Sequence, residues 1–155
     1  PLDILINNAG VGVNRRDLGE LDYDQILSHF RVNAMGPLRL TEALLPRLRQ
    51  GERKLVVNMT SRMGSIDDNG SGGAYAYRGS KAALNMFNRS LAVDLGPEGI
   101  VCVVLHPGWV RTRMGGSSAP TSVEESVGGL IEVIDGLDQE DSGRFYDYTG
   151  EEIPW

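Results

Sequence analysis

Tyr77 and Lys81 are the residues whose types and spacing could do acid–base chemistry, because they stand four positions apart in a segment with helical periodicity. Residues at this spacing share one face of a helix. An ammonium beside a phenol favours the phenolate, so we expect Lys81 to lower the Tyr77 pKa from its ordinary value of about 10. Such a tyrosine could exchange protons at neutral pH. Tyr75 lacks this partner because position 79 is glycine. Taken alone, the spacing also fits an ordinary helix with a surface tyrosine and lysine.

Ser61 adds a hydroxyl to the pair. It follows the apolar segment 54–60, at the carboxyl end of an expected buried strand, and the next strand-to-helix connection leads to Tyr77. A hydroxyl there could hydrogen-bond a substrate carbonyl oxygen that the tyrosine also contacts. Thr60 is the competing hydroxyl, but the alternation of side chains along a strand should point it elsewhere. Without Tyr77, Ser61 would be interpreted as a turn residue.

Asn33 lies inside a long expected helix, close to Gly36-Pro37. Asparagine is a poor helix former. It is either tolerated beside a break in the helix, or it marks a disruption whose freed backbone groups hold a water.

His106 could titrate near neutral pH. The sequence shows no cluster of histidine, cysteine and carboxylates around it, so we interpret it as structural and expect no metal. Arg111 and Arg113 could steer a phosphate or simply be solvated.

Alternating strands and helices are expected to position these residues. The expected strands are 2–6, 54–60, 100–105 and 144–148, and the expected helices are 22–49 with a kink at Gly36-Pro37, 74–95, and 121–137, with Asp22 and Thr121 as N-caps. This order predicts an α/β fold, a doubly wound, Rossmann-like parallel sheet. Ligands gather at the carboxyl ends of strands in such sheets. The polar segments 7–10, 60–64 and 106–108 all stand at such ends.

Composition excludes several function classes. The net charge of −6 over 155 residues, without a basic patch, disfavours nucleic-acid binding. No apolar run approaches the roughly 20 residues of a membrane helix, so no membrane partner is expected. The single cysteine, Cys102, stands in an apolar run and is expected to be a small core residue. Nothing indicates secretion, and we expect a cytoplasmic protein.

Together these segments resemble the short-chain dehydrogenase/reductase (SDR) family. They follow the family's order: Asn7-Asn8-Ala9-Gly10, Asn33, Ser61, Tyr77-x-x-x-Lys81, and Pro107-Gly108 followed by Thr112. No single motif is specific, but the joint match is, and it covers essentially the whole chain. Segments 60–65, 75–85, 106–110, 114–116 and 153–155 resemble the branch that holds sniffer-like carbonyl reductases and the bacterial developmental signalling protein C-factor.

The resemblance implies a role for each residue. Tyr77 would be the general acid/base that gives a proton to a carbonyl oxygen as hydride arrives from the nicotinamide. Ser61 would orient that oxygen, and Lys81 would lower the Tyr77 pKa and hydrogen-bond the nicotinamide ribose. Asn33 would hold a water that relays protons to Lys81. The residues implied to line the cofactor, NADP or NAD, are Asn8, Ala9, Gly10, Tyr77, Lys81, Pro107, Gly108, Val110 and Thr112.

The resemblance also implies what the 155 residues leave out. The family's glycine-rich turn binds the pyrophosphate at a helix N-terminus and would precede Pro1. We therefore interpret residues 1–155 as the C-terminal catalytic portion of a single SDR domain that lacks its N-terminal β-α-β nucleotide-binding part. A parallel sheet cut there exposes an apolar edge. We expect this stretch alone to bind dinucleotide poorly and to be prone to aggregate.

Two functions follow from these expectations. The first is an oxidoreductase that transfers a hydride between NAD(P)H and a small carbonyl or alcohol substrate. The alternative is a C-factor-like developmental signalling protein without a complete nucleotide site. A degenerate enzyme that serves only as a subunit is a weaker hypothesis, because all four residues of the implied catalytic set are retained. Helices 22–49 and 74–95 pair across a two-fold axis in many family members, so a homodimer is a further expectation.

Overall fold

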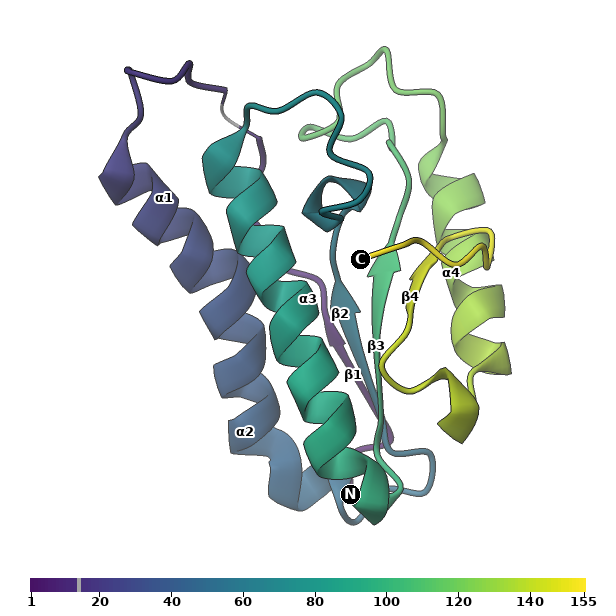
Figure 1. Ribbon diagram of the computed structural model, residues 1–155. Coiled ribbons are helices and arrows are strands. Elements are labelled where there is room, and N and C mark those ends of the chain that lie inside the picture. Colours follow the sequence, from purple (N-terminus) through teal and green to yellow (C-terminus); the bar gives the residue numbers. More distant parts are fainter. Residues whose placement is uncertain (14) are drawn as a thin grey trace.

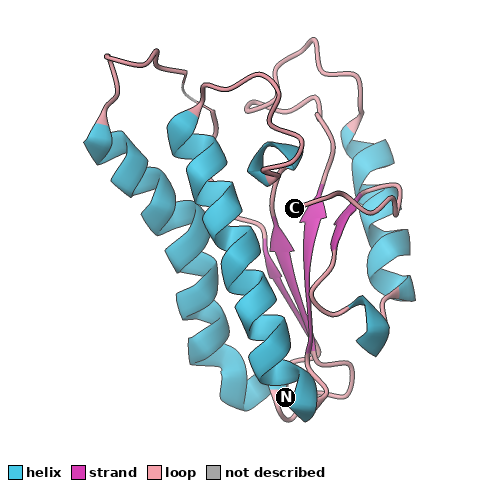
Figure 2. Ribbon diagram, viewed as in Figure 1, coloured by secondary structure: helices cyan, strands magenta, loops and turns pink. Residues whose placement is uncertain are grey.

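The computed structural model describes residues 1–13 and 15–155; residue 14, inside the predicted loop 11–21, lies outside the described residues. The predicted α/β order is confirmed: four parallel strands alternate with helices (Figures 1 and 2). The strands are β1 (Ile4–Asn7), β2 (Leu55–Met59), β3 (Val101–His106) and β4 (Phe145–Asp147), and the helices are α1 (Tyr23–Phe30), α2 (Gly36–Leu48), α3 (Tyr75–Leu95) and α4 (Val123–Gly136). The strands lie in the order β1-β2-β3-β4, so each is hydrogen-bonded to the next one along the chain.

Side-chain alternation along the central strands divides the core into two layers. Every residue of β2 is buried, as expected for a parallel strand covered on both faces. Val56 packs with residues of α2 and α3, including Leu48 and Ala92, whereas its neighbour Val57 packs with Ile134 of α4. Helices α1 to α3 therefore cover one face of the sheet and α4 covers the other (Figure 1). Burying a side chain such as Leu48 completely contributes about 1.5–3 kcal/mol.

The connection between β3 and α4 has to carry the chain to the opposite face of the sheet. The four strands follow one another across the sheet in a single direction. Because α2 and α3 lie on one face and α4 on the other, the crossover through α4 has the opposite hand to the crossovers through α2 and α3. The long loop over residues 107–122 makes this passage above the carboxyl edge of the sheet (Figure 1). A parallel bridge between Val110 and Thr121 closes the loop on itself. The fold thereby places a long loop over the edge where the site is expected.

The long helix expected over 22–49 is one continuous helical run with a change of winding inside it. Asp22 caps its start by accepting a hydrogen bond from the Gln25 backbone N–H, as predicted. A kink is predicted at Gly36-Pro37, and the structure shows a π-helical turn, Arg31–Met35, directly before that dipeptide. Pro37 then falls in the first turn of α2, where a missing N–H is harmless.

The later elements differ from the sequence expectations only at their ends. The strong helix expected over 74–95 is α3. The N-cap of α4 is Ser122, whose hydroxyl accepts from the Glu125 N–H, so the Thr121 prediction is wrong by one residue. Thr121 instead pairs with Val110 through its backbone.

The C-terminal tail covers β4 on the side of α3. Its Ile153 is buried and donates its N–H to the Phe145 carbonyl, and the Trp155 ring lies 5.6 Å from the Phe145 ring. The Asp67 N–H donates to the Trp155 carbonyl, which ties the tail to the loop after β2. None of the helices in the described part of the chain is long and apolar enough to cross a membrane.

Candidate active site

The carboxyl ends of β1, β2 and β3 bring the three predicted polar segments to one edge of the sheet. Asn7 is in register with Asn58 on β2, and Met59 is in register with Leu105 on β3. The segments 7–10, 60–64 and 106–108 therefore continue side by side from neighbouring strands. This arrangement confirms the expected meeting of the three segments.

Asn7 is held below this edge by a chain of buried amides. Its Nδ2 donates to Asn58 Oδ1 at 2.7 Å, and Asn58 Nδ2 donates in turn to Asn88 Oδ1 at 2.9 Å. Asn88 then donates to the Cys102 carbonyl. This network joins β1, β2, α3 and β3, and it fixes the strand ends that carry the site.

Helix α3 places Tyr77 and Lys81 on its inward face, as the four-residue spacing predicts. Both are buried, and the Lys81 Nζ lies 5.9 Å from the centroid of the Tyr77 ring. The ammonium donates a 2.8 Å hydrogen bond to the Met59 carbonyl at the end of β2. Tyr75, in contrast, is 45% exposed.

Ser61 meets Tyr77 at this edge. Ser61 is 7% exposed, and its hydroxyl opposes the rise of the Tyr77 pKa. The same hydroxyl accepts from the Met63 N–H, which fixes it at the start of the 3₁₀ turn Arg62–Gly64. Thr60 points elsewhere, as side-chain alternation predicts, and donates to Asn85 Oδ1 at 2.7 Å.

Burial controls the proton affinities of this pair. It raises the Tyr77 pKa, and the Ser61 hydrogen bond opposes that rise only in part. It lowers the pKa of Lys81 to about 8, because the charged form loses its hydration. The expected lowering of the Tyr77 pKa is therefore wrong for this chain. The physical reason is that desolvation of the buried phenol outweighs the opposing contribution of the Ser61 hydroxyl.

Asn33 occupies the π-helical turn and is completely buried. Its Oδ1 accepts from the Val11 N–H at 2.8 Å, and its Nδ2 donates to the Val11 carbonyl and to Ser80 Oγ. A Cβ added at Gly10 would lie 3.2 Å from Asn33 Oδ1 and 3.6 Å from Lys81 Nζ. The backbone at Gly10 therefore packs closely against both side chains, so Asn33 and Lys81 flank the same backbone position.

The predicted cofactor-lining residues gather around the same edge. Asn8, Ala9 and Gly10 are exposed after β1, and Pro107, Gly108 and Val110 are half-buried after β3. Gly108 has a φ of +85°, and a Cβ there would lie 2.8 Å from the Tyr148 ring, so this position requires glycine. Thr112 stabilises its own loop by accepting from the Gly115 N–H.

Burial or hydrogen bonds to the backbone account for the surroundings of several other polar residues. His106 ends β3, and burial with the nearby Arg62 guanidinium lowers its pKa to about 4. Arg111 donates to the carbonyls of Ala119 and Pro120, so it braces its loop. Cys102 is free and buried, and burial raises its pKa to about 12. No group of three or more His, Cys, Asp or Glu within residues 1–13 and 15–155 could hold a metal ion.

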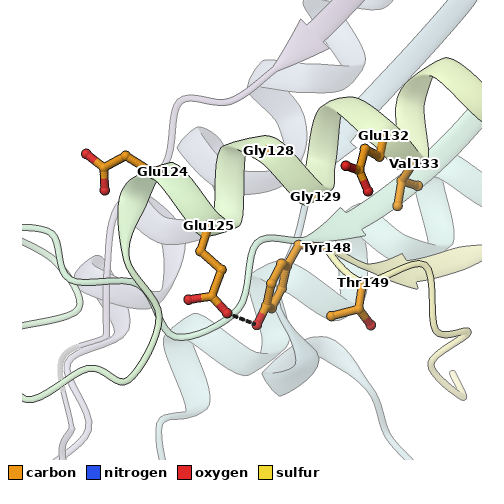
Figure 3. A pocket seen from close by; sticks show the side chains of 8 residues that line it. All are labelled: Glu124, Glu125, Gly128, Gly129, Glu132, Val133, Tyr148 and Thr149. Carbon is orange, nitrogen blue, oxygen red and sulfur yellow. Dashed lines mark hydrogen bonds between the residues drawn. The ribbon is translucent and has the colours of Figure 1, made fainter.

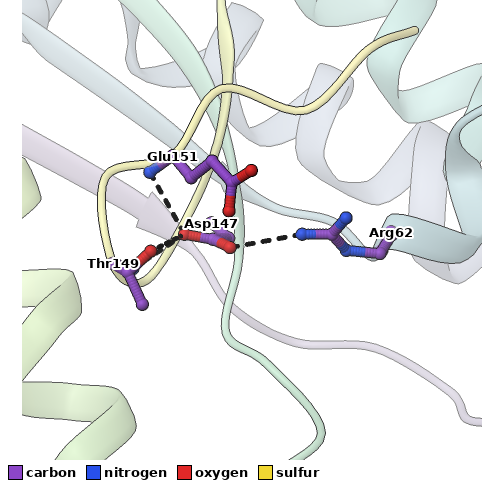
Figure 4. Close-up of polar contacts among 4 residues, drawn as sticks. All are labelled: Arg62, Asp147, Thr149 and Glu151. Atoms are coloured by element: carbon purple, nitrogen blue, oxygen red, sulfur yellow. Dashed lines mark hydrogen bonds and ion pairs between the residues drawn. The ribbon is translucent and has the colours of Figure 1, made fainter.

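Sequence reasoning missed an ion pair next to Ser61. Arg62 Nη2 lies 3.2 Å from Oδ2 of Asp147, and the other oxygen of Asp147 accepts from the Thr149 N–H and hydroxyl and from the Glu151 N–H (Figure 4). Burial alone would raise the Asp147 pKa, but these hydrogen bonds and the Arg62 charge lower it. The pair links the segment after Ser61 with the turn after β4. Its only sequence signal was an arginine directly after the serine.

A separate depression lies between α4 and the turn after β4 (Figure 3). It encloses about 630 Å³ and is lined by Glu124, Glu125, Gly128, Gly129, Glu132, Val133, Tyr148 and Thr149. Tyr148 donates to Glu125 across it, at 3.4 Å. None of the predicted site residues lines this depression, so it is distinct from the candidate active site.

Comparison with known proteins agrees with this geometry. A family model described as short chain dehydrogenase matches residues 1–122. The C-signal of Myxococcus xanthus is 57% identical over 155 residues, which cover 100% of this chain and 93% of that protein. The carbonyl reductase Sniffer of D. melanogaster superposes with a TM-score of 0.97 at 40% identity, and NADPH-bound carbonyl reductase from chicken fatty liver with 0.91 at 36%. Each superposition covers 99% of this chain and 66% of the solved one, so the chain spans just under two thirds of their length. The chain belongs to the short-chain dehydrogenase family.

Proposed function

We propose that this chain carries the catalytic site of an oxidoreductase that transfers a hydride between NAD(P)H and a small carbonyl or alcohol substrate. The observation that carries the proposal is the meeting of Ser61, Tyr77 and Lys81 at one buried edge of the sheet. Family membership and the likeness to carbonyl reductases support it.

The pKa shifts of Tyr77 and Lys81 suit reduction of a carbonyl, in which the site must give a proton to the substrate oxygen. Because burial raises the Tyr77 pKa, the phenol keeps its proton at neutral pH and is in the form that can give it to a carbonyl oxygen. The Ser61 hydroxyl, which already interacts with that phenol, would orient the same oxygen. Lys81, with a pKa of about 8, remains largely charged at pH 7 and would replenish the proton.

The residues present fit the nicotinamide-ribose end of NADP or NAD. An ammonium has three N–H donors, and Lys81 uses one on the Met59 carbonyl. Gly10 leaves open a space beside Lys81 that any side chain would crowd. We propose that Lys81 holds the ribose and that Asn8, Ala9, Pro107, Gly108, Val110 and Thr112 line the nicotinamide. The bound cofactor supplies the hydride, and the chain supplies position and the proton.

Asn33 holds the Val11 backbone against the π-helical turn. We propose that this contact sets the distance between the 7–10 segment and Lys81, and that a proton relay passes beside it. Both roles rest on the carbonyl-reducing function.

Substitution of Tyr77 tests the proposed function. Reduction of a panel of aldehydes and ketones is followed at millimolar NADPH and NADH. Tyr77→Phe should lower turnover by roughly 10²–10⁴-fold, the range of general acid catalysis. Tyr75→Phe is the matched control, since Tyr75 is exposed and has no lysine four residues on. Equal turnover in both variants would reject the role of Tyr77.

The second candidate function is that of a developmental signal. The 57% identity to C-signal extends over the whole chain and nearly the whole of that protein, which favours this hypothesis specifically. In that case the purified chain should elicit a response from cells that respond to Myxococcus xanthus C-signal, and Tyr77→Phe should be equally potent. Loss of the response in Tyr77→Phe would show that signalling depends on the proposed catalytic residue, so the two functions would not be independent.

We also propose that the chain forms a homodimer through α1, α2 and α3. Large apolar side chains remain exposed on these helices, including Leu27, Leu40 and Val93. The one cysteine is free, which accords with a reducing compartment, and we propose the cytoplasm.

A further inference from the structure

Ser80 is a buried serine of α3 that takes no part in the proposed proton transfer. It stands between Tyr77 and Lys81 in the sequence and is 2% exposed. Its hydroxyl donates to the Tyr77 carbonyl at 2.8 Å, a local bond of a kind that serines often make inside helices. The same oxygen accepts from the Asn33 Nδ2 at 3.0 Å. This second bond joins the helix of the proposed acid to the π-helical turn.

The directions of these hydrogen bonds are fixed by backbone groups. The Val11 N–H can only donate and the Val11 carbonyl can only accept, so Asn33 turns its Oδ1 to the first and its Nδ2 to the second. The other proton of that Nδ2 points to the Ser80 oxygen. Ser80 therefore gives its own proton to the Tyr77 carbonyl, which can only accept. One directed chain of hydrogen bonds thus runs from Val11 to the backbone of Tyr77.

The first turn of α3 lacks a cap that would hold it. Tyr77 is the third residue of the helix, where the backbone N–H groups have no partner within the helix. The N-cap residue, Ala74, makes no side-chain hydrogen bond to this turn. Its φ of +49° is in the left-handed region, which is unfavourable for alanine. Contacts from outside the helix therefore have to set the position of this turn.

Two side chains at the start of α3 make such contacts. Arg78 donates to the Met63 carbonyl at 3.3 Å, which ties the helix to the segment after β2. Ser80 ties it to the π-helical turn and, through that turn, to the backbone of Val11. Val11 directly follows the segment 7–10, part of the proposed nicotinamide lining. The Ser80 hydroxyl is thus the link between the helix of the proposed acid and this lining.

We propose that Ser80 is a positioning residue of the reductase site, which holds the backbone of Tyr77 at a fixed distance from the segment 7–11. Transfer of a proton and a hydride to one carbonyl requires that both donors keep a constant relation to it. The proposal rests on the proposed reductase function. Ser80 acts through Tyr77 and touches neither the substrate nor the cofactor.

Ser80→Ala tests this role in the reductase assay. The substitution removes one oxygen atom and adds no bulk, so the variant should fold. At millimolar NADPH, kcat should fall by about 10–100-fold, since a shift on the order of 1 Å in a reacting group has effects of this size. The KM for the carbonyl substrate should change by less than about threefold, because the substrate makes no contact with Ser80.

Two variants of the same helix separate positioning from a general loss of stability. Ser90→Ala makes the same chemical change at an exposed position and should leave kcat unchanged. Ala92→Gly weakens the helix at a buried position beyond the site and should leave kcat within about twofold of the native value. All variants are assayed below the temperature at which any of them begins to unfold.

Amide hydrogen exchange at Val11 tests the coupling without any turnover. Ser80→Ala removes an acceptor from the Asn33 amide, so the bonds between Asn33 and Val11 should open more readily. Exchange at Val11 should then accelerate by about threefold or more, whereas Ala92→Gly should leave it within about twofold of the native rate. A loss of stability elsewhere in the helix does not produce this difference.

Four results would overturn the proposal. They are a native kcat in Ser80→Ala, an equal fall of kcat in Ala92→Gly, a rise of KM in place of the fall in kcat, and unchanged exchange at Val11 in Ser80→Ala. A native chain that reduces no carbonyl would reject the proposed function instead. Accelerated exchange at Val11 in Ser80→Ala would then still support the coupling of α3 to the segment 7–11.

Discussion

Lys81 and Tyr77 are both removed from water, and each is thereby pushed toward its neutral form. In the folded chain Lys81 releases its proton near pH 8, whereas an unperturbed lysine holds it to about pH 10.4. Between these values the unfolded state binds more protons, so folding stability rises with pH. The raised pKa of Tyr77 acts in the opposite direction, but only above its ordinary value of about 10. The window for the lysine is therefore pH 8 to 10.

This linkage predicts a pH-dependent difference between the native chain and Lys81→Met. The free energy of unfolding of the native chain should rise by about 2–3 kcal/mol relative to Lys81→Met between pH 8 and 10. Urea denaturation at several pH values measures it. Lys54→Met, which keeps Lys81, should retain the rise, and parallel curves for the native chain and Lys81→Met would contradict the burial of this ammonium.

The helices and strands position the site through details that hydrophobic periodicity does not encode. The four-residue spacing of Tyr77 and Lys81 and the serine after a buried strand could be predicted, because both follow from helix and strand geometry. The π-helical turn was not predicted, and the contact that its Asn33 makes with the backbone of Val11 is a tertiary one that local periodicity does not show. The ion pair of Arg62 with Asp147 likewise joins residues 85 positions apart. The sign of the Tyr77 pKa shift depended on burial, which spacing alone does not give.

The role of Asn33 gives a prediction at this scale. Asn33→Ala leaves the Val11 N–H and carbonyl without their buried partner, so it should destabilise the fold by about 2–3 kcal/mol. Urea denaturation gives this value, and amide exchange at Val11 should accelerate. Asn69→Ala, in an exposed loop, should change stability by less than about 0.5 kcal/mol. Equal effects of the two substitutions would show that Asn33 only fills space.

The whole molecule presents apolar surface on more than one side. β1 is an edge strand whose Ile6 is 48% exposed, as expected for the apolar edge, and aggregation through this edge stays a prediction. The helical layer of α1, α2 and α3 carries Leu40 and Val93, which are 45% and 62% exposed. On the opposite face Ile131 of α4 is 53% exposed. Substitutions at Leu40, Val93 and Ile131 can therefore show which face forms the proposed dimer.

Sedimentation velocity distinguishes the surfaces. If the dimer forms through the helical layer, Leu40→Glu and Val93→Glu should each shift the chain to monomer, because a charge would have to be buried at the contact. Ile131→Glu adds the same charge at a similar exposure on the other face and should leave the dimer intact. A chain that is monomeric at all concentrations, or a dimer broken only by Ile131→Glu, would contradict this arrangement.

The measurement closest to the central claim is the NMR titration of Lys81 in chain labelled with ¹³C-lysine. The sequence has two lysines, Lys54 and Lys81, so Lys54→Arg assigns the ¹³Cε signals. We predict that Lys81 titrates near pH 8 and that its signal moves in Tyr77→Phe but not in Tyr75→Phe. A Lys81 that titrates at its unperturbed value of about 10.4 and does not sense Tyr77 would show that the two side chains share no buried site.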